Sequence, residues 1–142
     1  MGKGDHSLAL FGAVLKALRA DAAVSAHVGA RIHDDVPERV VWPYLTLTDG
    51  GSFAAFGSSD YEADDFAFDV HVWSRHINKT SSECRLICSA VQAALHDAEL
   101  DLGAGASLAR LSRARRMIFR DPDNITWHGV VSFEGRVETM EA

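Results

Sequence analysis

The sequence predicts an α+β fold, in which a mostly antiparallel mixed β-sheet has helices packed on one face. Two stretches carry apolar residues at three- and four-residue spacing, which is typical of amphipathic helices. Other stretches alternate apolar and polar residues, which is typical of half-buried strands. The 142 residues are enough for one domain and rarely for two. We therefore expect a single domain over residues 1–142, with an ordered core at about 7–138.

The chain is predicted to open with two helices. Apolar residues recur along residues 8–18, and Ser7 can cap the start of this first helix. Asp21 can cap a second, shorter helix over residues 22–27. Gly29 can then end this helix, because glycine readily adopts a left-handed backbone conformation.

Two short strands and a long polar segment follow. Arg31–Val36 is predicted to be a strand that ends at Pro37. Tyr44–Thr48 is the second strand, and Trp42-Pro43 favours an extended approach to it. Residues 49–60 are polar and rich in glycine, and a loop of this length in a compact domain is usually functional or disordered.

The second half of the chain is predicted to contain a strand, a helix and a long hairpin. Asp64–Ser74 alternates regularly, and Ser81–His96 has the apolar stripe of a helix. Residues 107–119 and 126–138 alternate on either side of a turn at Asp121–Asn124. The predicted order is α-β-β-β-α-β-β, with the short second helix after the first. Side chains expected to share one face of the third strand are Phe66, Phe68, Val70 and Val72.

The charge balance and the cysteine content exclude several classes of protein. Fourteen basic and twenty acidic residues give a formal net charge of −6, which argues against a dedicated nucleic-acid binder. Two cysteines are too few for the disulfide framework of a small secreted protein. The apolar run at Leu8–Leu15 is too short to span a bilayer, so no contact with a membrane is expected.

The residue pattern predicts no catalytic or cofactor site. The seven histidines show no His-x-x-x-His spacing and have no Cys-x-x-Cys partner, so no metal site is predicted. Cys84 and Cys88 lie on the apolar stripe of the 81–96 helix, where burial is expected. Gly103–Gly105 precedes a strand rather than a helix, which favours a turn over a phosphate-binding loop. We expect no catalytic residue, no metal and no cofactor.

Charged side chains gather on or next to two of the predicted strands. Edge strands carry charge to block aggregation, which is one explanation. Complementary faces of neighbouring subunits in a closed ring would show the same pattern. The pattern leaves both explanations open. Candidate subunit-interface residues are Arg110, Arg113, Arg115, Arg116 and Arg120 on one segment, and Asp60, Asp64, Asp65 and Asp69 on the other.

Aromatic residues around the glycine-rich segment form a second candidate surface. The neighbouring Gly, Ser and Ala residues are too small to bury two phenylalanine rings. The rings therefore cover their own core or dock a partner. Candidates for docking a partner are Phe53, Phe56 and Tyr61.

Several stretches, taken in order, carry a resemblance to a known family. They are Leu18–Val24, Arg31–Pro37 with Trp42–Leu47, Val70–Arg75, and Arg120–Asp123 with Thr126–Gly129. In this order and spacing the chain resembles the tail-terminator, or tail-completion, proteins of long-tailed phages. It is similar above all to their relatives in phage-like gene transfer agents. The resemblance extends from about Leu8 to Glu138.

The resemblance implies a structural role, with a mixed sheet flanked by helices and no catalytic residues. Proteins of this family form a hexameric ring that caps the head-proximal end of the tail tube and stops tube polymerisation. The implied partners are other copies of this chain, the tail tube protein and a head-side stopper or connector protein. DNA would pass through the ring without sequence-specific binding. The expected location is the tail or neck of a virion or phage-like particle, after synthesis in the host cytoplasm.

Three alternatives stay open on the sequence. Another neck component, such as a stopper or head–tail connector, would share the structural role. A small metal-dependent or cysteine hydrolase on an α+β scaffold would need bound metal, or activity that is lost in Cys88→Ser. A nucleic-acid adaptor that uses the arginine-rich strand would show salt-dependent affinity for DNA.

Overall fold

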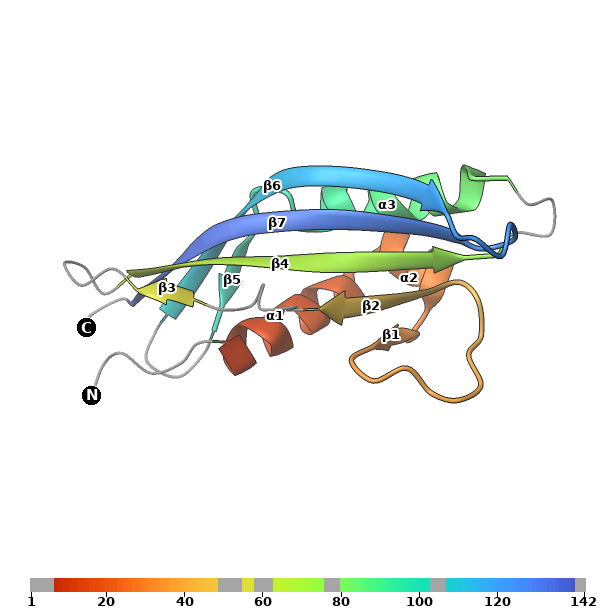
Figure 1. Cartoon of the computed structure of the whole chain (residues 1–142). Helices are drawn as coiled ribbons and strands as arrows, with labels where there is room; N and C mark the ends of the chain where they lie inside the picture. The colour runs from red at the N-terminus through yellow and green to blue at the C-terminus, as the bar shows by residue number, and fades with distance from the viewer. Residues whose placement is uncertain (1–6, 49–54, 58–62, 76–79, 103–106, 140–142) are drawn as a thin grey trace.

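Three helices and seven strands make up the described part of the chain (Figure 1). The structure, a computed structural model, describes residues 7–48, 55–57, 63–75, 80–102 and 107–139. The helices are α1 (Ser7–Ala20), α2 (Ala22–Val28) and α3 (Ser82–Leu95). The strands are β1 (Ile32–His33), β2 (Tyr44–Thr48), β3 (Ala55–Gly57), β4 (Ala63–Ser74), β5 (Glu99–Asp101), β6 (Ser107–Arg120) and β7 (Trp127–Thr139).

The strands form one sheet in the spatial order β1-β2-β4-β7-β6-β5, and β3 pairs with the first part of β4. The pairing of β1 with β2 is parallel, and the other pairings of the described strands are antiparallel. All three helices lie on one face of the sheet (Figure 1). The α+β class, the mostly antiparallel mixed sheet and the helices on one face are therefore confirmed.

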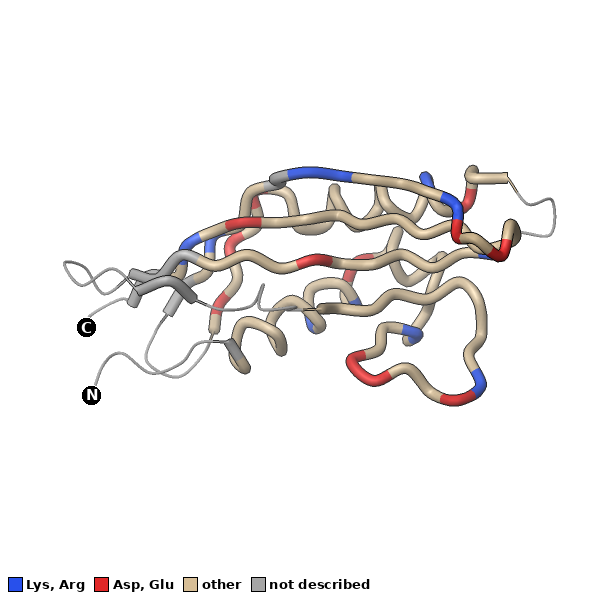
Figure 2. Tube along the Cα trace, in the orientation of Figure 1, with Lys and Arg blue, Asp and Glu red and all other residues tan. Residues whose placement is uncertain are grey.

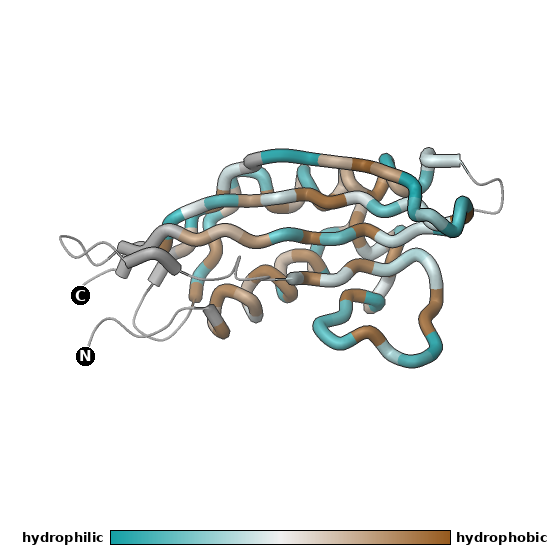
Figure 3. The backbone as a smooth tube through the Cα atoms, in the orientation of Figure 1, coloured by the Kyte–Doolittle hydropathy of each residue, from teal (hydrophilic) through white to brown (hydrophobic). Residues whose placement is uncertain are grey.

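The core lies between this face and the helices. On β4, the side chains of Phe66, Phe68, Val70 and Val72 are buried, as their alternation predicted. Figure 3 shows hydrophobic and hydrophilic residues succeeding one another along the long strands, because successive side chains point to opposite faces. The helix residues that complete this core include Leu10, Val14, Leu18, Ile87, Val91 and Leu95.

Helix α3 packs closely on β7 through two cysteines and a glycine. Cys84 and Cys88 are both buried and unpaired, as their place on the apolar stripe predicted. They lie over Gly129, where an added Cβ would come within 2.3 Å of the Cys88 Sγ atom. Only a residue without a side chain fits beneath the two sulfur atoms.

The short second helix forms where its capping residues predicted it. The Asp21 side chain accepts a hydrogen bond from the Val24 amide at 3.0 Å, which satisfies one free donor at the start of α2. Gly29 ends the helix with a φ of 57°, which a glycine adopts without strain. The three described helices have at most 14 residues, and none is long and apolar enough to cross a membrane.

The structure corrects the predicted strand boundaries in three places. The first strand covers only Ile32–His33, because residues 34–43 leave the sheet as a loop before β2 begins. Two three-residue strands, β3 and β5, were not predicted. Segments this short give no measurable alternation, and their pairing depends on strands far away in the sequence.

Candidate assembly surfaces

The predicted basic strand, β6, lies at an edge of the sheet. Strand β7 pairs along one side of it, whereas β5 covers its other side only at Leu108–Arg110. One further backbone hydrogen bond, from the Leu111 amide to the Ala98 carbonyl at 2.9 Å, continues this pairing by one residue. From Ser112 to Arg120, no described strand pairs with the outer side of β6. Most of the predicted arginines therefore lie along a free edge.

Two neighbouring arginines of β6 point to opposite faces of the sheet, and an irregularity before them decides which face each one takes. The register shifts between Arg113 and Arg115, so that Arg115 pairs with Ser132 and Arg116 with the buried Val131. Arg115 accordingly lies on the face away from the helices. Arg116 lies on the helix side and donates a hydrogen bond to the Ser89 hydroxyl of α3 at 3.3 Å. Positive charge thus borders the edge on both faces.

The other candidate arginines differ in their partners. Arg110 forms an ion pair with Glu99 of β5, and Arg120 lies over the ring of Trp127 at 4.7 Å from its centroid. The structure gives Arg115 and Arg116 no carboxylate partner among the described residues. The Arg113 side chain lies outside the described part. Arg115 and Arg116 are therefore the exposed cations best placed to meet another molecule.

The candidate acidic residues lie on or near the central strand β4. Strand β7 separates β4 from β6, so the acidic and basic segments are not neighbours within one chain. Asp64 and Asp65 pair with β7 and β3 through their backbones, and their side chains lie outside the described part. Asp69 accepts a hydrogen bond from the Ser132 hydroxyl at 2.6 Å. Asp60 lies outside the described residues.

The candidate docking aromatics fall largely outside the described residues. Phe53 and Tyr61 are among the residues that the structure does not describe. The backbone of Phe56 belongs to β3 and pairs with Asp65 of β4. Their role in docking a partner stays a prediction.

A row of rings crosses the face of the sheet opposite the helices, which we call the open face. Register places Tyr44, Trp73, His128 and Phe119 side by side on four adjacent strands. Trp73 and His128 stack with their centroids 3.7 Å apart, and Phe119 meets His128 edge-on at 4.7 Å. Each ring belongs to a different strand. Sequence reasoning missed the row, since only the register of the sheet brings the four together.

Two histidines of the open face contact each other. His71 Nδ1 and His128 Nε2 are 2.7 Å apart, and the Thr48 hydroxyl contacts His71 Nε2 at 2.8 Å. Burial and the neighbouring His71 lower the pKa of His128 to about 4. Burial also lowers the pKa of His71, although Asp69 opposes this. Both rings are therefore neutral at pH 7. The described residues include no group of three metal-ligating side chains.

The loop of residues 34–43 projects from the opposite edge of the sheet, after β1 (Figure 1). Arg31 fixes its end by donating from Nε to the Pro43 carbonyl at 2.8 Å. Arg75 lies over the Trp42 ring at 4.3 Å from its centroid and donates to the Thr126 hydroxyl at 2.8 Å. These contacts tie the loop to the sheet and to the β6–β7 turn.

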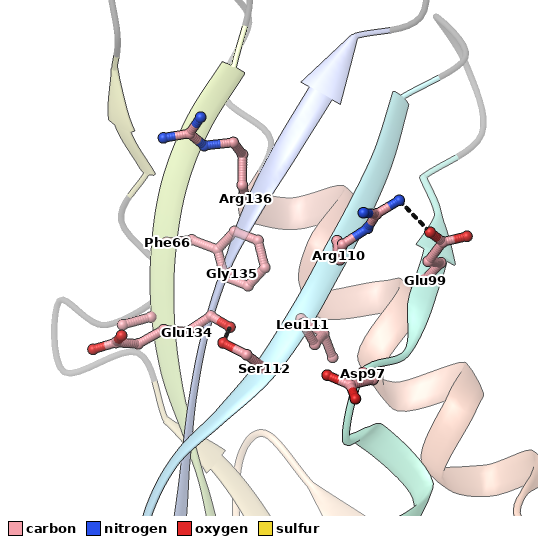
Figure 4. A pocket seen from close by; sticks show the side chains of 10 residues that line it. Phe66, Asp97, Glu99, Arg110, Leu111, Ser112, Glu134, Gly135 and Arg136 are labelled. Atoms are coloured by element: carbon pink, nitrogen blue, oxygen red, sulfur yellow. Dashed lines mark hydrogen bonds and ion pairs between the residues drawn. The ribbon is translucent and has the colours of Figure 1, made fainter.

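A groove of about 890 Å³ lies near β5 (Figure 4). Its charged groups include the Arg110–Glu99 ion pair, and the Ser112 hydroxyl donates to the Glu134 carbonyl at 3.1 Å. The groove holds acidic, basic and small residues in a mixture that points to no particular reaction. Its lining is Phe66, Ala67, Asp97, Glu99, Arg110, Leu111, Ser112, Glu134, Gly135 and Arg136.

Comparison with known proteins assigns this fold to a family. The family model described as tail completion protein gp17 matches residues 12–138. The chain belongs to this family. It is a structural protein of a phage-type tail, located in the virion, and it assembles there with other tail or head proteins.

A solved structure supports the same assignment. The tail completion chain is similar to a chain in the virion of a native gene transfer agent particle, with 25% identity and a TM-score of 0.76. The match covers 91% of this chain and 94% of that chain. No curated protein matches the sequence.

Proposed function

We propose that this chain forms a hexameric ring that terminates the tail. The ring caps the head-proximal end of the tail tube, stops tube polymerisation and joins the tail to a stopper or connector of the head. The observation that supports this most directly is the free edge of β6, which carries exposed arginines in a protein of the tail completion family. An exposed strand edge invites a partner and is seldom left open in a protein that works alone.

The role divides the candidate residues between two contacts. Contacts between subunits include Arg110, Arg113, Arg115, Arg116 and Arg120. Asp60, Asp64, Asp65 and Asp69 contribute from β4 and the segment before it. Phe53, Phe56 and Tyr61 dock onto the tail tube.

The role needs no catalysis, metal or cofactor, and the whole chain acts as one domain. The net charge of −6 suits a ring through which DNA passes, because like charge discourages binding to phosphates. Another neck component is the second candidate, since a stopper or connector would also join head and tail within the same virion.

Mass measurement and tail length test the proposal together. A hexamer has a mass of about 92 kDa, six times the 15.4 kDa of one chain, and light scattering distinguishes it from the monomer. The mass is measured for the free protein and for protein bound to tail tubes. When this protein is absent, tail tubes should reach uncontrolled lengths and should not be joined to heads. Tubes of normal length that fail only to join heads would instead indicate a stopper or connector.

A further inference from the structure

The proposed ring requires two different contact surfaces on each subunit. A closed ring of six copies is built from head-to-tail contacts, in which one patch meets another patch of its neighbour. The free part of β6 and the loop after β1, at opposite edges of the sheet, offer such a pair of surfaces. Figure 2 shows a basic stretch on β6 and mostly acidic charge in the loop.

The first surface is the free part of β6, which we call the basic edge. Its exposed cations include Arg115 and Arg116, one on each face of the sheet. Met117 and Phe119 follow on the open face, and they are 43% and 41% exposed. The basic edge therefore combines two exposed apolar side chains with positive charge.

The second surface is the segment of residues 34–41 at the opposite edge, which we call the acidic loop. Asp34, Asp35 and Glu38 are exposed, and Arg39 is the only basic residue in this segment. Val36 and Val41 lie among them and are 41% and 61% exposed. The acidic loop therefore combines two exposed apolar side chains with a net negative charge.

The acidic loop is also held in place, as a docking element needs to be. Arg31 binds the Pro43 carbonyl and, at 3.2 Å, the His27 carbonyl, so it joins the end of the loop to α2. The stacking of Arg75 on Trp42 holds the same end from the other side. A loop that is ordered before contact loses less conformational entropy when it binds.

The carboxylates of β4 are less suitable as the counterpart of the basic edge. Strand β2 separates β4 from β1, and β7 separates it from β6, so they are set back from both ends of the strand order. The acidic loop, in contrast, projects beyond the edge strand β1.

We propose that the acidic loop of one subunit docks onto the basic edge of the next. The valines would meet Met117 and Phe119 at the centre, and the carboxylates would face Arg115 and Arg116 around them. An apolar centre with complementary charge at the rim is the usual composition of such contacts. This inference rests on the proposed ring and names the two surfaces that close it.

Charge reversal on each surface tests the contact. One variant carries Asp34→Lys and Asp35→Lys, and the other carries Arg115→Glu and Arg116→Glu. Ring formation is measured by native mass spectrometry in solution and on tail tubes. Each variant alone should assemble at least about tenfold less tightly than the wild type, because each contact then places like charges together.

An equimolar mixture of the two variants should form rings again. In the mixture, the intact loop of one variant meets the intact edge of the other, and the reversed loop meets the reversed edge. Alternating rings with three copies of each variant are the expected product. A chain that carries all four substitutions should also assemble. Lys16→Glu, a charge reversal on α1, is the matched control and should assemble as the wild type does.

Three results would overturn the docking. The first is that either variant alone forms normal rings. The second is that the mixture forms no rings, and the third is that the four-substitution chain forms none. Each result counts only when circular dichroism shows that the variants are folded. If tail length is still controlled in these cases, the proposed function stands and only the contact is wrong. A wild-type protein that forms no hexamer in solution or on tubes would overturn the ring and the docking together.

Discussion

The two faces of the sheet come from the same strands but differ in what covers them. On the helix side, Phe68 of β4 and Phe133 of β7 stack with centroids 5.4 Å apart and are fully buried. On the open face, Trp73 and His128 stack at 3.7 Å but remain partly exposed. Phe119 ends their row with 41% of its surface exposed. Aromatic stacking occurs on both faces, so burial under the helices is what distinguishes them.

The difference separates residues that stabilise the subunit from residues available to its neighbours. Removing apolar surface from water supplies most of the stabilisation of a fold, and on the helix side this burial is complete within one chain. On the open face and the β6 edge, Met117 and Phe119 stay partly exposed within one chain. The same kind of substitution should therefore have different consequences on the two faces.

Phe68→Ala should give the largest effect. The side chain is fully buried between Phe66 and Phe133, so its removal leaves a cavity and should cost about 3–5 kcal/mol of the free energy of unfolding. Phe119→Ala is the matched variant on the open face and should cost less than about 1 kcal/mol. Urea denaturation of the monomer measures both values. Equal costs would show that helix cover does not separate the two faces.

Gly129→Ala should give a smaller but clear loss. The added Cβ would lie within 2.3 Å of the Cys88 Sγ atom and 3.1 Å of the Cys84 Sγ atom, so α3 must shift away from β7. Overpacking of this kind typically costs about 1–3 kcal/mol. The free energy of unfolding is again measured by urea denaturation.

A double variant tests whether the Cys88 sulfur is the cause. Cys88→Ala removes the nearest atom, so Gly129→Ala should cost less in that background than in the wild type. The difference between the two costs is the coupling between the positions, and about 1 kcal/mol is expected. Strictly additive costs would mean that the glycine is required for another reason.

The sequence predicted the elements that carry a repeated local pattern. The alternation from Phe66 to Val72 defined the buried face of β4, and the spacing of Cys84, Cys88 and Val91 defined the buried stripe of α3. The caps Asp21 and Gly29 located the second helix. In each case the signal lies within a few residues, because it reflects the geometry of one element.

Features that depend on distant segments were not predicted. The row from Tyr44 to Phe119 requires the register of four strands, and no local pattern fixes that register. The placement of Arg115 on the open face and of Arg116 on the helix side depends on one irregularity between Arg113 and Arg115 of β6. The arginines were recognised as a candidate surface from their crowding, but the edge that makes them accessible is a property of the sheet.

The smallest expected effect is a loss of stability in mild acid, and it comes from the open face. The folded state holds the pKa of His128 at about 4, chiefly through burial and also through His71, whereas an unfolded histidine has a pKa of about 6.5. The unfolded chain therefore binds more protons between pH 6.5 and 4. The free energy of unfolding should fall as the pH is lowered through this window, and it should be unaffected by this group above it.

The magnitude should be modest, because His128 is partly exposed and solvent screens its charge. A loss of about 1 kcal/mol between pH 7 and pH 4.5 is expected from this residue. Urea denaturation at both pH values, for the wild type and for His128→Phe, separates the contribution of His128 from that of carboxylates that titrate in the same pH range. The titration of the two imidazoles by nuclear magnetic resonance should give midpoints below 6.5. A midpoint for His128 near 6.5 would mean that the contact between His71 and His128 does not hold the rings neutral, and that the open face is as hydrated as any exposed surface.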